Sequence, residues 1–161
     1  MCSSDLMIVW IGKTLALAIH ARQISEHGGS PELRDEGLLE SALARPQQLY
    51  AYGDPPPDLA DLAAAVAGGL ARNHPFVDGN KRTAAVCCET FIELNGASLI
   101  AEGLELFNQY LALAEGSLSE QDFAAWLRTR LRLAGQPRLQ EPQAAYRRGR
   151  GRPRTRIAVS E

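Results

Sequence analysis

The sequence predicts an all-α domain, and three features support this prediction. Hydrophobic residues make up 45% of the 161 residues while aromatic residues make up only 6%, so alanine and leucine supply most of the apolar content. These residue types favour helices over strands. Apolar positions also recur at helical spacing between segments that end at glycine or proline. A chain of this length is expected to form one domain with a core large enough to fold independently.

The first predicted helix covers Thr14–Glu26 and is stopped by Gly28-Gly29. A short apolar run, Ile8–Ile11, precedes it and is predicted to be either a strand or a lead-in to the helix. The second predicted helix, Gly37–Ala44, is expected to end before Pro46, because a proline inside a helix removes a backbone hydrogen bond and clashes with the preceding turn.

The third predicted helix, Leu59–Asn73, is the richest in alanine and leucine and is therefore expected to be the most buried. It follows the rigid linker Gly53–Pro57, and Asp58 is placed to cap its start. Its end leads directly into His74.

The remainder of the domain is predicted to hold three more helices and one extended piece. The expected elements are a helix over Lys81–Leu94, an extended stretch over Ala97–Ala101, a helix over Leu104–Glu115, and a last helix that begins at the Ser119–Asp122 capping box and runs through Leu131.

Charge divides the chain into two parts. Residues 132–161 hold eight basic and two acidic residues, a charge of +6, whereas residues 1–131 hold nine basic and seventeen acidic residues, a charge of −8; together they give the net charge of −2. We therefore predict a helical domain over residues 8–131, a disordered N-terminus over residues 1–7 and a basic disordered tail over residues 132–161.

The tail contains a candidate DNA-binding element, Arg150-Gly151-Arg152-Pro153, which looks like the core of an AT-hook. An extended Arg-Gly-Arg segment fits the narrow minor groove of A·T-rich DNA, where the negative potential is enhanced. A weak DNA contact through the tail is one interpretation, and a solvated tail that binds any polyanion is the other.

The cysteines and the apolar runs indicate a cytoplasmic protein. Of the three cysteines, Cys87 and Cys88 are adjacent on a predicted helix, which gives neither a disulfide framework nor a metal-binding spacing, so we expect buried free thiols. No apolar run is long and charge-free enough to span a bilayer. The segment Met7–Ile19 is interrupted by Lys13 and makes a poor signal peptide.

The densest chemistry lies in the run His74–Ala84, between two predicted helices. Gly79 permits a positive φ and a close backbone approach, and Asn80 is predicted to be the N-cap of the helix that follows. The free backbone N–H groups of a first helical turn form an anion site. Lys81 and Arg82 are unfavourable in that turn unless an anion such as a phosphate chain binds there.

Two further side chains in this run complete the pattern of a phosphoryl- or nucleotidyl-transfer site. Asp78 offers the hard oxygen ligand that Mg²⁺ prefers. His74 is the candidate proton acceptor, because histidine is the side chain most often used as a general base near neutral pH. Such catalysis consists largely of positioning and charge neutralisation, so a base, a ligand for Mg²⁺ and an anion site together predict phosphoryl or nucleotidyl transfer.

The run His74–Arg82 resembles the signature of the Fic/Doc family, and specifically of its Doc (death-on-curing) branch. Fic adenylyltransferases typically carry Gly where this chain has Lys81 and a second Arg where it has Ala85. The Doc branch carries Lys followed by Arg-Thr-Ala, as here. The similarity extends to His27-Gly28-Gly29 and Leu94-Asn95-Gly96, and covers roughly Ile8 to Leu131.

The resemblance implies a compact Fic/Doc-like helical bundle and the toxin of a type II toxin–antitoxin system. Such toxins are kinases that transfer phosphate from ATP to a hydroxyl of elongation factor Tu and so inhibit translation. His74 would be the catalytic base and Asp78 would hold the metal, while Phe76 would fix the loop to the core. Phosphate binding would fall to four residues: Gly79, Asn80, Lys81 and Arg82.

Alternatives remain open at this stage. An adenylyltransferase of the same fold is one, and an inactive protein that binds DNA or a partner through its tail is another. His20 and His27 are expected to be surface or packing residues. The stretch Ser98–Gly103 matches the spacing of an inhibitory motif of Fic enzymes, but it falls in a predicted extended segment, so we expect restraint by a separate antitoxin whose helix or disordered segment binds an apolar groove beside the motif.

Overall fold

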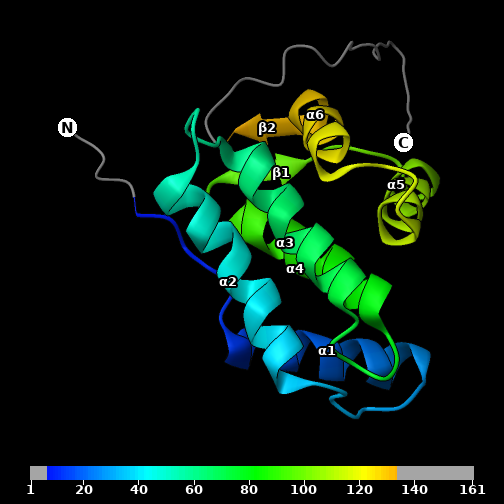
Figure 1. Cartoon of the computed structure of the whole chain (residues 1–161). Helices are drawn as coiled ribbons and strands as arrows, with labels where there is room; N and C mark the ends of the chain where they lie inside the picture. Colours follow the sequence, from blue (N-terminus) through cyan, green and yellow to red (C-terminus); the bar gives the residue numbers. More distant parts are fainter. Residues whose placement is uncertain (1–6, 134–161) are drawn as a thin grey trace, which may run out of the picture.

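The computed structural model describes residues 7–133, in which six helices surround a shared core and a two-stranded sheet covers one end (Figure 1). The helices are α1 (Lys13–His27), α2 (Glu36–Tyr52), α3 (Leu59–Asn73), α4 (Asn80–Leu94), α5 (Gly103–Glu115) and α6 (Glu120–Arg130), and the strands are β1 (Ala97–Leu99) and β2 (Leu131–Leu133). The predicted all-α class is confirmed. The tail element Arg150-Gly151-Arg152-Pro153 lies outside the described residues.

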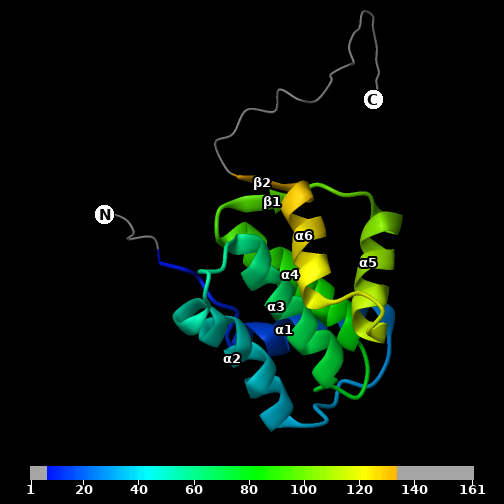
Figure 2. The ribbon, with the colours of Figure 1, turned by 45° about the horizontal axis from the view of Figure 1, so that its top comes forward.

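Helix α3 forms the centre of the bundle, as its composition predicts. It contacts α2, α4, α5 and α6, and Figure 2 shows it enclosed by them. Every residue from Leu62 to Ala71 is buried. Small residues make this packing possible: a Cβ added at Gly69 would lie 3.2 Å from the carbonyl oxygen of Ala42, so α2 and α3 approach closely only because that side chain is missing.

The start of α3 is fixed by a capping box and by an arginine from α6. Asp58 accepts a hydrogen bond from the backbone N–H of Asp61 at 2.9 Å, and the Asp61 side chain accepts from the N–H of Asp58 at 3.0 Å. Arg128 donates to both Asp58 oxygens, at 2.7 and 3.1 Å. Hydrogen bonding to Arg128 is the main reason that the pKa of Asp58 is lowered from 3.8 to about 2.

This pKa shift predicts acid sensitivity at the α3–α6 contact. Because the folded protein binds the Asp58 proton less tightly than the unfolded chain, the stabilisation is complete above about pH 4 and is lost as the pH falls towards 2. The pair is half exposed, so its contribution should be only about 0.5–1 kcal/mol. Asp58→Asn keeps a capping oxygen. At neutral pH its free energy of unfolding, measured by urea titration, should be lower than that of wild type by this amount, and near pH 2 the two should be equal. An equal deficit at both pH values would contradict the assignment.

The predicted end of the second helix is wrong, as α2 shows. It continues through Pro46 to Tyr52, rather than ending before the proline. Pro46 is buried, and α2 packs against α3, so tertiary contacts outweigh the local cost of the missing N–H. The apolar run Ile8–Ile11 forms no strand and leads into α1. Its backbone is held by Asn95, whose side-chain amide bonds to both the N–H and the carbonyl of Val9, at 2.8 and 2.9 Å.

The two strands bring together the predicted extended stretch and the end of the domain. Ala97, Ser98 and Leu99 of β1 pair antiparallel with Leu133, Arg132 and Leu131 of β2. Ser98 therefore lies in a strand, as predicted for that stretch. The last helix ends at Arg130, one residue earlier than expected, and the folded part of the chain extends at least to Leu133 rather than ending at Leu131.

Cys87 and Cys88 are both free and buried on α4, which confirms the prediction for these two residues. Burial raises the pKa of each thiol to about 12, so both remain neutral and unreactive at physiological pH. Across residues 7–133, every helix is too short or too polar to traverse a lipid bilayer.

Candidate active site in the loop between α3 and α4

The site begins at the C-terminus of α3, where His74 occupies the left-handed conformation with φ 50° and ψ 57°. This conformation is uncommon for a residue other than glycine. Arg34 stabilises it from the loop after α1: its Nε donates to the His74 carbonyl at 2.7 Å and its guanidinium NH2 donates to the Asn73 carbonyl at 2.9 Å. The clamp satisfies carbonyl groups at the helix end and leaves the His74 side chain exposed.

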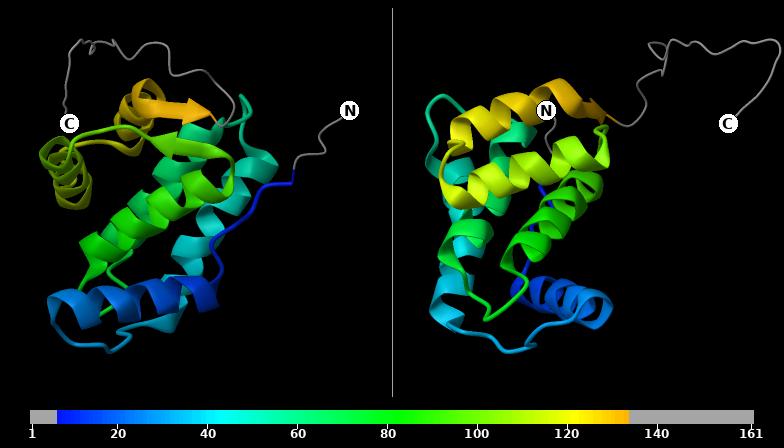
Figure 3. Two further views of the ribbon diagram at one scale, coloured as in Figure 1. Left: turned by 180° about the vertical axis from the view of Figure 1, so that it is seen from behind. Right: turned by 90° about the vertical axis from the view of Figure 1, so that its right-hand side faces the viewer.

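The motif loop, residues 75–79, pairs with the loop that joins α1 to α2. Leu33 and Phe76 form an antiparallel bridge. The N–H groups of Arg34 and Asp35 both donate to the Pro75 carbonyl, at 2.7 and 3.0 Å. Figure 3 shows the two loops at the same end of the molecule, with α1 lying across that end. The motif loop is therefore held by backbone bonds from a distant segment.

Asn80 fixes the other side of the motif loop, and its role differs from the predicted one. Its Oδ1 accepts from the N–H of Phe76 at 3.0 Å and its Nδ2 donates to the Phe76 carbonyl at 2.8 Å. The N-cap of α4 is Gly79, at φ 80° and ψ 17°, and no side chain caps this helix start within residues 7–133. The prediction that Asn80 is the N-cap is wrong, because its amide closes the loop instead.

Phe76 holds the loop against the core, as the resemblance implies. Its side chain is almost fully buried. Its ring stacks on the imidazole of His20, with the ring centroids 3.7 Å apart and the planes 6° from parallel. This stack joins the motif loop to α1.

Asp78 is oriented by the loop after α1 and keeps one oxygen available. Its Oδ2 accepts from the backbone N–H of Ser30 at 2.8 Å, whereas its Oδ1 bonds to no residue between 7 and 133. Gly29 makes this approach possible, because a Cβ there would lie 3.1 Å from the Cβ of Asp78. No cluster of three or more metal-binding side chains occurs in residues 7–133. The arrangement fits Mg²⁺ bound by one carboxylate together with phosphate and water oxygens.

Lys81 and Arg82 stand exposed on the uncapped first turn of α4. Neither side chain forms an ion pair with any residue of the described part, 7–133. Two unpaired cations beside free backbone N–H groups at a helix start form a strong anion-binding arrangement.

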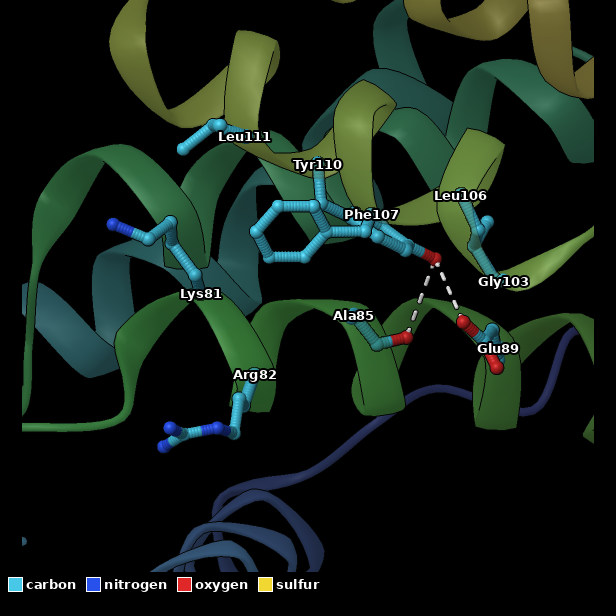
Figure 4. A pocket seen from close by; sticks show the side chains of 9 residues that line it. All are labelled: Lys81, Arg82, Ala85, Glu89, Gly103, Leu106, Phe107, Tyr110 and Leu111. Carbon is cyan, nitrogen blue, oxygen red and sulfur yellow. Dashed lines mark hydrogen bonds between the residues drawn. The ribbon is translucent and has the colours of Figure 1, made fainter. Parts of the chain in front are cut away.

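A groove between α4 and α5 adjoins this cationic turn (Figure 4). Its lining is mainly apolar and comes from Lys81, Arg82, Ala85, Glu89, Gly103, Leu106, Phe107, Tyr110 and Leu111. Lys81 and Arg82 lie at one end and Glu89 lies towards the other, where it accepts a hydrogen bond from the Tyr110 hydroxyl at 3.2 Å. Burial raises the pKa of Glu89.

The structure thus brings His74, Asp78, Gly79, Asn80, Lys81 and Arg82 together in one loop and one helical turn. Sequence reasoning missed Arg34 and the N–H of Ser30, which orient two of these residues from the loop after α1, and it did not foresee how His20 would be used. In the sequence, the signal for that loop is Gly28-Gly29, whose predicted role is only to end the first helix.

Comparisons with known proteins identify the family of this chain. The family model described as the Fic/DOC family matches residues 10–92. The chain is 34% identical over 112 residues to the protein kinase doc of Escherichia phage P1, a match that covers 70% of this chain and 87% of the phage protein. It is 51% identical over 75 residues to the toxin Doc of Mycolicibacterium smegmatis, covering 47% of this chain and 58% of that protein, which is less than two thirds of its length. The chain belongs to the Fic/Doc family, in its Doc branch.

Proposed function

We propose that this protein is the toxin of a type II toxin–antitoxin pair and acts as a protein kinase, transferring phosphate from ATP to a hydroxyl of a translation factor of the elongation factor Tu type. The observation that carries the proposal is the meeting, in one loop, of an exposed histidine, a carboxylate with a free oxygen and an uncapped cationic helix start. The names of the two relatives, a protein kinase and a toxin, support it.

The phosphate chain of ATP would bind at the start of α4. The backbone N–H groups from Gly79 onward and the side chains of Lys81 and Arg82 supply hydrogen bonds and positive charge there. Asp78 would hold Mg²⁺ through its Oδ1, and a bound Mg²⁺ neutralises part of the phosphate charge. Asn80 would act indirectly, by keeping the loop closed through Phe76.

His74 would accept the proton of the acceptor hydroxyl. The hydroxyl oxygen forms a bond to the γ-phosphorus as the bond between that phosphorus and the β–γ bridging oxygen breaks, so the products are a phosphorylated protein and ADP. The proton passes to the imidazole and from there to solvent. The Arg34 clamp on the backbone of His74 fixes the base beside the motif loop without using its ring.

Two positions favour phosphoryl over adenylyl transfer. Lys81 and Ala85 are the residues at which this chain departs from the pattern typical of Fic adenylyltransferases. Both line the groove between α4 and α5, so an arginine at position 85 would place a further cation there. The set of cations around the phosphates therefore differs from that of an adenylyltransferase, which changes how the nucleotide sits.

The reaction is tested by following the two ends of the phosphate chain separately. Purified protein is incubated with Mg²⁺, a translation factor of the elongation factor Tu type and ATP labelled at either the γ- or the α-phosphate, and the factor is then analysed by mass spectrometry. We expect label from the γ position and a phosphate adduct. Label from the α position with an AMP adduct would show that the protein is an adenylyltransferase rather than a kinase. An unmodified factor would contradict the proposed target.

The antitoxin would bind the groove between α4 and α5. The apolar floor suits the apolar face of a partner helix, and Lys81 and Arg82 at one end suit an acidic residue of that partner. Phe107 is 59% exposed at this groove, which makes it a candidate anchor for the partner.

Phe107→Arg is therefore expected to weaken antitoxin binding by at least about tenfold, since loss of a central aromatic anchor commonly reduces the binding free energy by about 2 kcal/mol or more. Isothermal titration calorimetry with the antitoxin from the neighbouring reading frame measures this. Tyr52→Arg is the matched control, because Tyr52 is an exposed aromatic residue at the end of α2, outside the groove. If the antitoxin bound both variants with equal affinity, its binding site would have to lie outside this groove.

A further inference from the structure

His20 on α1 is a buried polar residue that the reaction described above does not use. Only 3% of its surface is exposed. Its Nε2 lies 2.8 Å from the carbonyl oxygen of Asp78, 58 residues further along the chain. A carbonyl oxygen only accepts hydrogen bonds, so Nε2 must carry the proton in this contact.

The carbonyl that His20 holds belongs to the peptide between Asp78 and Gly79. This peptide is trans, so its carbonyl and its N–H point in opposite directions. Holding the carbonyl of Asp78 towards α1 therefore turns the N–H of Gly79 away from α1. That N–H is the first backbone donor available to a phosphate bound at the start of α4.

The backbone of Gly79 indicates what the hydrogen bond prevents. Its φ of 80° and ψ of 17° match the third residue of a type II turn. A type I turn differs mainly in the orientation of the central peptide, and its third residue has a negative φ. Glycine tolerates both arrangements, so the residue itself does not select one. In the flipped arrangement the N–H of Gly79 would point towards α1.

We infer that His20 is a positioning residue: its Nε2–H holds the Asp78–Gly79 peptide in the orientation that presents the Gly79 N–H to the phosphate. The inference rests on the proposed nucleotide site and adds a residue from α1 to it. The stack of His20 on Phe76 fixes the plane of the imidazole, so its ring and its donor anchor two consecutive parts of the motif loop.

Two substitutions separate the donor from the ring. His20→Phe keeps an aromatic ring for Phe76 but has no donor, whereas His20→Gln keeps an N–H donor near the Nε2 position but has no ring. The probe is Mg²⁺ with a non-hydrolysable ATP analogue, and the readout is its affinity by calorimetry. We expect His20→Phe to bind about tenfold more weakly than wild type, because only the fraction with the correct peptide orientation binds. We expect His20→Gln to bind within about threefold of wild type.

A purely structural role gives a different pattern. It would lower the thermal midpoint of both variants and leave their affinities equal to each other, which would overturn the inference. Wild-type affinity in His20→Phe would also overturn it. If wild type itself fails to bind the analogue, the proposed function is contradicted rather than the role of His20.

A measurement on wild-type protein keeps the inference testable even if His20→Phe does not fold. The ¹⁵N and ¹H signals of the imidazole show which ring nitrogen carries the proton. We expect a proton on Nε2 of His20, and a change in its signal when the Mg²⁺–analogue complex is added. An Nε2 without a proton would overturn the inference, because the contact with the Asp78 carbonyl could not then be a hydrogen bond.

Discussion

Replacing His74 with alanine is expected to reduce phosphoryl transfer by about 10²–10⁴-fold, the range typical for loss of a general base, and to abolish growth arrest in cells. The side chain is exposed, so its removal should leave the fold intact. The left-handed backbone at this position is held by Arg34 and by the bonds of the neighbouring loop rather than by the imidazole. Rate measurements with labelled ATP, together with circular dichroism and thermal unfolding, separate the chemical effect from a structural one.

His27→Ala is the matched control for this experiment. His27 is also exposed and also lies at the end of a helix, but it belongs to α1 and makes no contact that the proposed reaction uses. The His27→Ala variant should therefore remain fully toxic. Toxicity retained by His74→Ala would overturn the assignment of the base, and toxicity lost equally in both variants would point to a general effect of removing a surface histidine.

Replacing Asp78 with asparagine is expected to lower the rate by at least about 10²-fold, because the metal contributes several kcal/mol of charge stabilisation in such reactions. Asparagine keeps the shape of the side chain and an oxygen that accepts from Ser30, so the loop should stay in place. What is lost is the negative charge that the Oδ1 of Asp78 would offer to Mg²⁺ in the proposed site. Calorimetry should show weaker binding of the Mg²⁺–nucleotide complex, with little change in the midpoint of thermal unfolding.

Asp54→Asn serves as the comparison. Asp54 is an exposed carboxylate in the linker before α3, outside the motif loop. The Asp54→Asn variant should therefore bind the Mg²⁺–nucleotide complex as wild type does. Unchanged nucleotide binding in Asp78→Asn would contradict the assignment of the metal ligand. It would leave the base assignment untouched, because His74 is tested independently.

The elements that sequence predicted well are those governed by local patterns. Leu59–Asn73 was predicted with the bounds that α3 has, because an aspartate cap and a long alanine-rich segment agree with each other. The loop that carries His74 and Asp78 was placed correctly between two helices for the same reason. Pro46 was misread because the rule that proline ends a helix considers the backbone alone, whereas here burial of α2 against α3 decides the outcome.

The parts that sequence could not predict depend on residues distant in the chain. Asn80 could either cap α4 or close the loop onto Phe76, and both are local hydrogen-bond patterns of asparagine; only the folded loop selects the second. The contact of His20 with Asp78 joins positions 58 residues apart, and the clamp of Arg34 on His74 joins positions 40 residues apart. No periodicity or motif in the sequence encodes such pairs.

The uncapped start of α4 limits how far this fold could be improved by protein engineering. A common way to make a helical protein more heat-resistant is to install an N-cap side chain, which adds about 1 kcal/mol. At Gly79 the new side chain would compete for the N–H groups at which we propose that a phosphate binds, and it would have to adopt a backbone conformation that favours glycine. Selection for higher thermal stability is therefore expected to change other helix ends and to leave the start of α4 without an N-cap side chain.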